Sequence, residues 1–149
     1  MTDTIVIAEI AKGTIHATTS ELVTAAAAMG SAPIVIVPCT DASIADAAAS
    51  IQGASKVIAA KSDAFAHYDA AGWASALDAV APAGTILMAA TPQSKDLAAR
   101  LAARRNLSVV QDVVAINGNQ LTSPVSSGKA MQTVALSGPA VVSIREIGR

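Results

Sequence analysis

The sequence predicts an α/β fold, a three-layer, doubly wound and mainly parallel sheet with antiparallel strands near the C-terminus. Over the first two thirds of the 149 residues, apolar runs alternate with segments of helical period. That alternation is typical of strand–helix–strand units, which build parallel sheets. Over the last third, apolar segments follow one another without helical segments, and Asn117-Gly118 is a strong hairpin signal. No linker or internal repeat divides the chain, so we expect a single domain over residues 1–149.

Strands are predicted where apolar residues run almost without interruption, as in strands that are buried on both faces. The predicted strands of the parallel sheet cover residues 4–8, 33–37, 56–60, 85–90 and 107–110. The later predicted strands cover residues 113–116, 120–123, 131–136 and 141–144. Pro124 and Ser127-Gly128 are expected to interrupt the chain between two of these later strands.

Helices are predicted between the strands from cap residues and from apolar spacing. The four predicted helices run from residues 18–21 to Gly30, from residue 41 or 43 to about Gly53, from Trp73 to Val80, and from Ser94 to Asn106. Thr91 or Ser94 can cap the last of these helices, and Pro92 suits its first turn. Residues 61–72 show the least regular pattern.

The composition excludes several classes of function. A formal net charge of −1 argues against a nucleic-acid partner, because phosphate binding needs clustered Lys and Arg. Cys39 is the single cysteine, which excludes an internal disulfide and a thiolate cluster, and fits a reducing cytosol. No apolar run approaches the ~18 residues of a membrane span. Asp3 and the lack of a basic start argue against a signal peptide, so we expect a cytoplasmic protein.

The ends of the predicted strands supply the candidate binding residues. In open parallel sheets, ligands bind beyond the C-terminal ends of the strands, where the strand order reverses. Glu9, Thr40, Thr91 and Ser94 follow three predicted strands and are the candidate cofactor-binding residues. Amides at the helix start near Ser94 could hold a phosphate, although the carboxylate of Asp96 would compete for them. Nucleotide binding and simple helix capping are therefore both open interpretations.

The sequence holds no catalytic arrangement that we can identify. The motifs GxGxxG, GxxxxGK and GxSxG are absent, so neither a phosphate loop nor a nucleophile elbow is supported. His16 and His67 lie too far apart in sequence to indicate a metal pair. Cys39 is expected to be a small buried hydrophobe, with a reactive thiol as the alternative. We expect no catalytic residue, no metal site, and an accessory role rather than an enzyme.

Two groups of side chains each allow two interpretations. Asp96, Arg100 and Arg104 recur four residues apart, which favours a solvated face whose charges pair with one another. The same face could instead meet the carboxylates of a partner. The aromatic side chains gather in one part of the chain, where they form either a satellite core or an interface anchor. These aromatic residues are Phe65, Tyr68 and Trp73.

Four segments of the chain resemble, in order, the motifs of one known protein family. Residues 6–9, VIAE, are similar to that family's opening strand. Residues 94–104, SKDLAARLAAR, resemble its "GKDLAPRLAARL" segment, and residues 111–113, QDV, resemble its "SDV". Residues 123–130, SPVSSGKA, are similar to its "RPIYAGKA". From Ile5 to Ile144 the chain thus resembles the N-terminal domain of the electron transfer flavoprotein alpha subunit. Serines at 94, 123 and 126 replace that family's glycine, arginine and tyrosine.

The resemblance implies an adenine-nucleotide-alpha-hydrolase-like fold that acts by association in electron transfer. In the family this domain packs against the beta subunit, FAD is held by a C-terminal domain that would begin where this chain ends, and AMP belongs to the beta subunit. We therefore expect no intrinsic cofactor, with FAD or AMP bound weakly or through a partner. The expected partner is a beta-subunit-like flavoprotein or a second copy in a homodimer, and the matching residues Lys95, Asp96, Arg100 and Lys129 are the expected interface. The alternative is a stand-alone module that binds AMP, ATP or a flavin.

Overall fold

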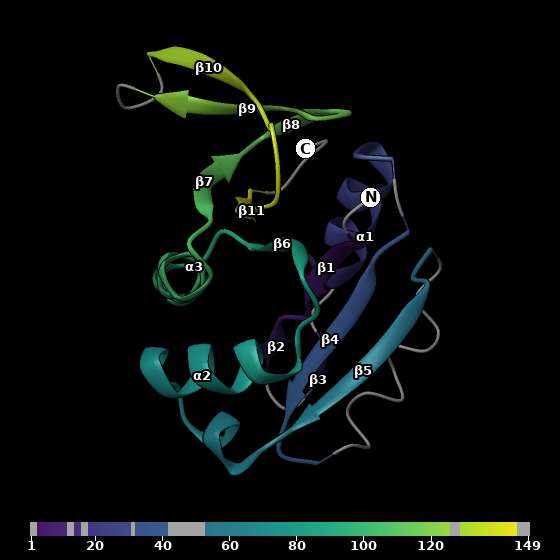
Figure 1. The fold of residues 1–149 in the computed structure, drawn as a ribbon, viewed down its shortest axis with the longest axis vertical. Coiled ribbons are helices and arrows are strands. Elements are labelled where there is room, and N and C mark those ends of the chain that lie inside the picture. The colour runs from purple at the N-terminus through teal and green to yellow at the C-terminus, as the bar shows by residue number, and fades with distance from the viewer. Residues whose placement is uncertain are drawn as a thin grey trace.

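The fold centres on a six-stranded parallel sheet with the strand order β5-β4-β1-β6-β11-β7 (Figure 1). The computed structural model describes residues 3–11, 14–15, 18–30, 32–41, 53–125 and 129–145. The strands of this sheet are β1 (Asp3–Ile7), β4 (Ile34–Cys39), β5 (Lys56–Lys61), β6 (Gly84–Ala89), β7 (Ser108–Val113) and β11 (Ala140–Ile144). The predicted α/β class and the parallel sheet are confirmed.

The sheet forms because its inner strands are apolar on both faces. Every residue of β6 and of β11 is buried, and Ile5 and Val6 of β1 are fully buried. Neither face of such strands can meet water, so helices must cover both sides. β11 lies between β6 and β7 and is parallel to both, so this strand belongs to the central sheet and not to the predicted antiparallel additions.

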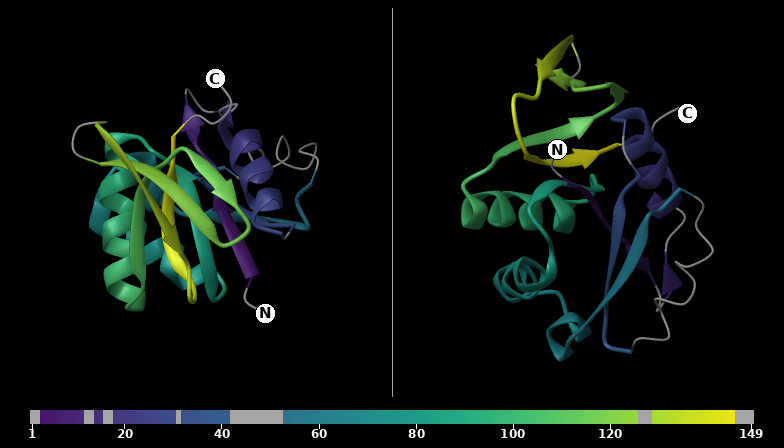
Figure 2. Two further views of the ribbon diagram at one scale, coloured as in Figure 1. Left: turned by 90° about the horizontal axis from the view of Figure 1, so that it is seen from above. Right: turned by 45° about the vertical axis from the view of Figure 1, so that its right-hand side comes forward.

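Helices cover the two faces of the sheet and complete the three layers. α1 (Thr18–Ala28) packs on one face, and α2 (Ala70–Val80) and α3 (Pro92–Arg105) pack on the other, as Figure 2 shows from above. The apolar spacing that predicts the last helix corresponds to a stripe of four buried residues. These residues are Leu97, Ala98, Leu101 and Ala102. The helix predicted from residue 41 or 43 to Gly53 lies almost entirely outside the described residues.

Cap residues set the helix starts earlier than predicted. The side chain of Asp69 accepts a hydrogen bond from the Gly72 amide at 3.3 Å, so α2 begins at Ala70 and not at Trp73. Of the two predicted caps of α3, Thr91 is confirmed, with Pro92 in the first turn as expected, so the helix begins at Pro92 rather than at Ser94. Asn106 ends α3 in the left-handed conformation, with φ of 55°. Within the segment predicted to be irregular, the structure has a short 3-10 helix, η2 (Asp63–Ala66).

A separate three-stranded antiparallel sheet stands beside the central one (Figure 1). Its strands are β8 (Ala115–Asn117), β9 (Gln120–Val125) and β10 (Ala130–Ala135), in the order β10-β9-β8. The predicted hairpin is confirmed, with Asn117 paired to Gln120 across a two-residue loop. Pro124 does not interrupt the chain as expected, since it lies inside β9 opposite Met131.

Two further observations complete the fold. A short antiparallel pair, β2 (Ile10–Ala11) and β3 (Thr14–Ile15), follows β1 and was not predicted. Each strand of this pair has only two residues, which is too short for a periodic signal. Within the described part of the chain, no helix is both long enough and apolar enough to cross a membrane.

Candidate functional site

A cavity of about 360 Å³ opens at the C-terminal ends of β1 and β6. From β1 the chain adds β4 and β5 on one side and β6, β11 and β7 on the other, so the strand order reverses between β1 and β6. This is the position where open parallel sheets bind ligands. The walls come from the end of β1, the end of β6, the start of α3 and the segment around Tyr68 and Trp73.

Three of the four candidate cofactor-binding residues meet at this cavity. Glu9, Thr91 and Ser94 all line it, although they come from two distant parts of the sequence. Thr40 does not line it and lies exposed beyond the end of β4. The reason is topological, because β1 separates β4 from β6 and moves the end of β4 one strand farther away.

Glu9 is held at the cavity by the start of α1. Its carboxylate oxygen Oε2 accepts a hydrogen bond from the Thr18 hydroxyl at 2.7 Å. Its backbone N–H donates to the Thr19 hydroxyl at 3.2 Å, and Thr19 is fully buried. The carboxylate therefore has a fixed place at the cavity wall, where it would repel an anion and accept hydrogen bonds from hydroxyl or amino groups.

The start of α3 offers few donors to a phosphate. Pro92 has no N–H, and the Ser94 N–H already donates to the Thr91 hydroxyl at 3.1 Å. The Lys95 N–H donates to the Thr91 carbonyl at 2.8 Å. A helix start binds phosphate through amides that lack such partners. The geometry thus favours the capping interpretation of Thr91 and Ser94 over a phosphate cradle.

The aromatic group forms both core and cavity wall. Phe65 is buried and meets the ring of Trp73 edge-on, with 4.9 Å between ring centroids, and Tyr68 lies 5.4 Å from Trp73. The indole N–H of Trp73 donates to the His67 carbonyl, and the Tyr68 hydroxyl donates to the Gln93 carbonyl, each at 3.0 Å. Both polar tips are therefore bound within the chain, and the ring faces remain to shape the cavity. Sequence reasoning noted this cluster but did not place it at the site.

Cys39 behaves as a buried apolar group. Cys39 is 2% exposed, and its thiol donates a hydrogen bond to the Ala60 carbonyl at 3.8 Å. Burial raises the pKa of the Cys39 thiol, and the Asp41 carboxylate adds to that effect. A thiol of this kind is a poor nucleophile. His67 is exposed, His16 lies outside the described residues, and no group of three or more metal-binding side chains occurs in the described ranges.

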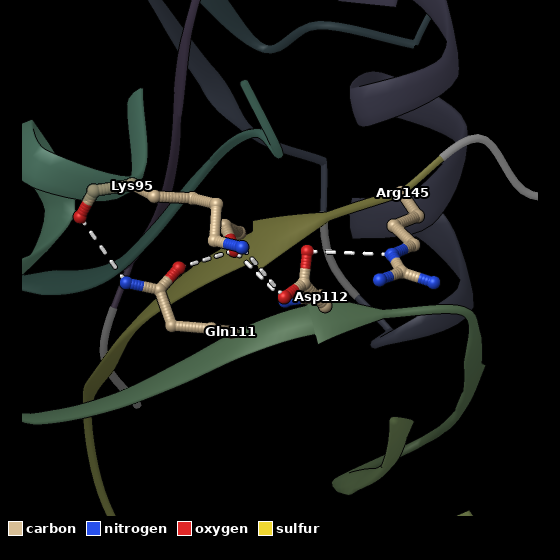
Figure 3. A network of polar contacts seen from close by, with 5 residues as sticks. Lys95, Gln111, Asp112 and Arg145 are labelled. Atoms are coloured by element: carbon tan, nitrogen blue, oxygen red, sulfur yellow. Dashed lines mark hydrogen bonds and ion pairs between the residues drawn. The ribbon is translucent and has the colours of Figure 1, made fainter. Parts of the chain in front are cut away.

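A second polar cluster lies where α3 starts beside the ends of β7 and β11 (Figure 3). Asp112 sits between two cations, with Lys95 Nζ 2.8 Å from its Oδ2 and Arg145 Nε 3.3 Å from its Oδ1. The hydrogen bond from Lys95 is the main reason why the pKa of Asp112 is below its ordinary value, with burial opposing it. Asp112 holds the left-handed conformation, with φ of 60°, which Asp tolerates better than most residues.

The cluster explains a bulge in β7. The register shifts so that Gln111 and Asp112 together oppose Ser143 of β11. The buried Ser143 hydroxyl accepts from the Asp112 N–H at 2.9 Å and donates to the Gln111 side-chain carbonyl. The Gln111 amide in turn donates to the Lys95 carbonyl at 3.2 Å. Lys95 and Asp112 were each matched to a motif in the sequence, but nothing in their 17-residue separation indicated this contact.

The outer face of α3 departs from the predicted ladder. Asp96 and Arg100 pair at 3.3 Å with both side chains about half exposed, as expected. Arg104 does not continue that ladder, because it pairs with Asp78 of α2 at 3.4 Å. Arg105, which sequence reasoning missed, also binds Asp78 at 2.7 Å.

The guanidinium of Arg105 also closes the end of α2. It donates to the carbonyls of Asp78, Ala81 and Pro82, at 3.1, 2.6 and 2.8 Å. These carbonyls lie at the end of the helix, where they have no partner within it. The hydrogen bond from Arg105 to the Asp78 carboxylate is the main cause that lowers the pKa of Asp78, and burial opposes it. The charge of Arg105 and the hydrogen bond from Arg104 add to the lowering. Lys129, the last of the expected interface residues, is exposed and precedes β10 in the small sheet.

Comparison with known proteins agrees with this architecture. Residues 4–147 match the family described as "Electron transfer flavoprotein domain". The chain is 38% identical over 120 residues to electron transfer flavoprotein subunit alpha of Mycobacterium tuberculosis H37Rv, a match covering 76% of this chain and 37% of the relative. It is 31% identical to the mitochondrial subunit alpha of Arabidopsis thaliana, over 95% of this chain and 42% of the relative. The subunit alpha of Mycobacterium leprae is 34% identical over 119 residues.

The chain spans about two fifths of the length of the curated relatives that it matches. The match nonetheless runs through almost all of the described fold, from β1 to beyond β11. It includes the bulge in β7 and the α3 segment whose resemblance the sequence indicated. The chain belongs to the electron transfer flavoprotein family and is similar to its alpha subunits.

Proposed function

We propose that this chain serves electron transfer as an alpha-subunit-like domain, by binding a flavin-carrying, beta-subunit-like protein. The observation that carries the proposal is the family match over residues 4–147. The polar side chains of the matched α3 motif support it, since Lys95, Asp96 and Arg100 form ion pairs and still remain partly exposed. In the described residues, the cavity lacks a nucleophile paired with a base, which favours association over catalysis.

The start of α3 is the surface that we assign to the partner. Lys95 and Arg145 remain 40% and 53% exposed although both bind Asp112, and Arg100 is 51% exposed. Lys95 and Arg145 thus reach solvent beside Asp112 at the end of β7, and Arg100 reaches solvent beside Asp96 farther along α3. Such a surface suits a partner that presents carboxylates, because charge complementarity guides association. Asp96 gives the patch a local anion, and Lys129 on the small sheet would be a separate contact.

Affinity capture from cells of the source organism tests this proposal. The tagged chain should retain a protein that gives the eluate flavin absorbance. Arg100→Glu should reduce that absorbance by about tenfold, since it reverses a charge at the assigned surface. Lys56→Glu is the matched control, because Lys56 is an exposed cation at the opposite edge of the central sheet. Failure to capture flavoprotein, or equal loss in both variants, would contradict the proposal.

The cavity favours a second candidate function, the binding of a small molecule with an aromatic ring. Its volume of about 360 Å³ falls in the range of ligand pockets, and Tyr68 and Trp73 provide ring faces for stacking. The Glu9 carboxylate and the occupied amides of α3 favour the nucleoside or flavin part of a ligand over its phosphates. A flavin nucleotide or AMP would then bind by its ring, with its phosphates directed away from the cavity.

Trp73 gives this second candidate a direct test. It is the only tryptophan in the sequence, so its fluorescence reports the cavity alone. Adenosine, AMP, ATP, FMN and FAD should be titrated with thermal unfolding followed in parallel. A ligand at a hundred times its Kd raises the free energy of unfolding by about 2.7 kcal/mol. Unchanged fluorescence and an unchanged Tm at millimolar ligand would exclude the candidate.

A further inference from the structure

β10 is an edge strand that lacks the usual protection against pairing. Among the described residues β10 pairs with β9 alone, and five of its six residues are exposed. Its sequence, AMQTVA, contains no charged residue and no proline. Edge strands of native proteins are usually guarded by charges, bulges, prolines or short length, because their free N–H and C=O groups recruit other strands.

The other described edges carry such guards. β5, at one edge of the central sheet, begins and ends with the exposed lysines Lys56 and Lys61. β7, at the other edge, has the bulge at Gln111 and Asp112. β8, the second edge of the small sheet, has three residues. β10 thus differs from each of them in being regular, uncharged and six residues long.

The register shows which backbone groups of β10 face outward. Asn117 and Gln120 close the two-residue hairpin, so the backbone groups of Gln120 and of Thr122 point toward β8. The Thr122 carbonyl accordingly accepts a hydrogen bond from the Val114 N–H at 2.8 Å. The intervening residues of β9 therefore face β10. Their partners in β10 are Ala130, Gln132 and Val134, in register with the Leu136 N–H that donates to Asn119. The outward-facing residues are Met131, Thr133 and Ala135.

This alternation also explains how Pro124 fits inside β9. Pro124 shares the orientation of Gln120 and Thr122, so its nitrogen faces away from β10. The missing N–H therefore removes no hydrogen bond between β9 and β10. The register between β9 and β10 runs without a shift from Ala130 to Ala135, and among the described residues no strand pairs with the outer side of β10.

We propose that β10 pairs with β10 of a second copy of this chain, antiparallel about a twofold axis at Thr133. In that register Thr133 opposes Thr133 of the second copy, and Met131 opposes its Ala135. All three outward-facing residues then form hydrogen-bonded pairs, which exchange both of their backbone hydrogen bonds. A twofold contact uses the same patch on both copies, as most homodimers do.

The side chains suit this arrangement. β10 contains no charge, so no like charges meet across the axis, and the two Lys129 residues lie at opposite ends of the paired segment. Met131, 57% exposed in the isolated chain, would be covered beside the small Ala135 of the second copy. The two small sheets would join into one continuous antiparallel sheet, separate from the α3 surface that we assign to the flavoprotein partner.

Sedimentation velocity over a range of concentrations tests the proposal. The wild-type chain should show a reversible monomer–dimer equilibrium. Thr133→Pro removes the outward N–H at the axis in both copies and should raise the dimer Kd by about ten- to a hundredfold. Thr133→Val is the matched control, because it loses the same 2.9 Å hydroxyl contact with Thr122 but keeps the backbone donor. A strictly monomeric wild type, or a dimer that Thr133→Pro leaves intact, would overturn the proposal.

Cysteine cross-linking keeps the proposal testable if Thr133→Pro fails to fold. Opposed residues in such a pair have Cα atoms about 5.5 Å apart, which a disulfide can span. Thr133→Cys should form a covalent dimer under mild oxidation, and the native Cys39 is buried and should not interfere. Lys56→Cys, at an edge guarded by lysines, should stay monomeric. Equal cross-linking of the two variants would contradict the register.

Discussion

The two sheets of this molecule have opposite relations to water. In the central sheet, all six residues of β6 and all five of β11 are buried between helices. In the small sheet, five of the six residues of β10 are exposed, and Leu121 and Ser123 of β9 are among the few that reach the core. Burial thus assigns the stability of the fold mainly to the parallel sheet, whereas the antiparallel sheet presents most of β10 to solvent.

The largest expected effect comes from shortening one apolar side chain to alanine in each of the two sheets. Leu87 of β6 is fully buried, so Leu87→Ala should lower the free energy of unfolding by about 2–5 kcal/mol. Met131 of β10 is 57% exposed, and Met131→Ala should change it by no more than about 0.5 kcal/mol. Urea unfolding at concentrations that keep the chain monomeric gives both values. Similar losses at the two positions would mean that the small sheet carries core energy.

The next effect extends the comparison to the helix layer. Arg105 is 15% exposed and binds one carboxylate and three carbonyls, so Arg105→Ala should cost about 2–3 kcal/mol. Arg100→Ala should cost about 0.5 kcal/mol or less, because its pair with Asp96 is solvated. Arg105→Lys should recover only part of the loss, since an ammonium cannot reproduce the planar fork. Equal costs for Arg105→Ala and Arg100→Ala would refute the assignment of Arg105 as the side chain that links α3 to the end of α2.

The smallest effect is expected at Asp112, which lies near the end of β7, just before the chain enters the small sheet. Its pKa in the folded state is lowered, chiefly by the hydrogen bond from Lys95, so folding favours the charged carboxylate. That stabilisation is present above the unfolded pKa of about 3.9 and is lost as the pH falls through the lower folded value.

Asp112→Asn should therefore cost about 1 kcal/mol at pH 7, with a smaller cost at pH 3. Asn also tolerates the left-handed backbone at this position, so the variant changes the charge and not the bulge. Urea midpoints from pH 7 to pH 3 give the difference. Parallel pH profiles for wild type and variant would show that the Lys95 and Arg145 contacts contribute nothing to folding.

Sequence patterns predicted individual helices and strands better than they predicted which strands lie side by side. The continuous apolar run at 85–90 identified β6, and Asn117-Gly118 identified the β8–β9 hairpin, because each signal is local. The insertion of β11 between β6 and β7 has no local signal, since strand order depends on how the helices cross the sheet. The grouping of Glu9 with Thr91 and Ser94 was predictable because these residues follow the ends of predicted strands. Thr40 also follows such an end, and its exclusion from the cavity depends on the strand order, which has no local signal.

Side-chain contacts between distant segments were the least predictable. Lys95 and Asp112 could be matched to family motifs, yet their ion pair depends on the bulge that Ser143 stabilises. Arg105 lies outside the four-residue spacing of Asp96, Arg100 and Arg104, so the sequence pattern did not single it out. Its burial follows from the packing of α3 against α2, which places Asp78 and the end of α2 beside it.

Isothermal titration of the purified chain with the electron transfer flavoprotein beta subunit of the same genome, with flavin present, tests whether the chain acts by association. An alpha-subunit-like domain that works by association should bind with a micromolar or lower Kd, and Arg100→Glu should weaken that binding while Lys56→Glu leaves it unchanged. A titration without binding heat at several temperatures would contradict this role, and so would a Kd that Arg100→Glu leaves unchanged.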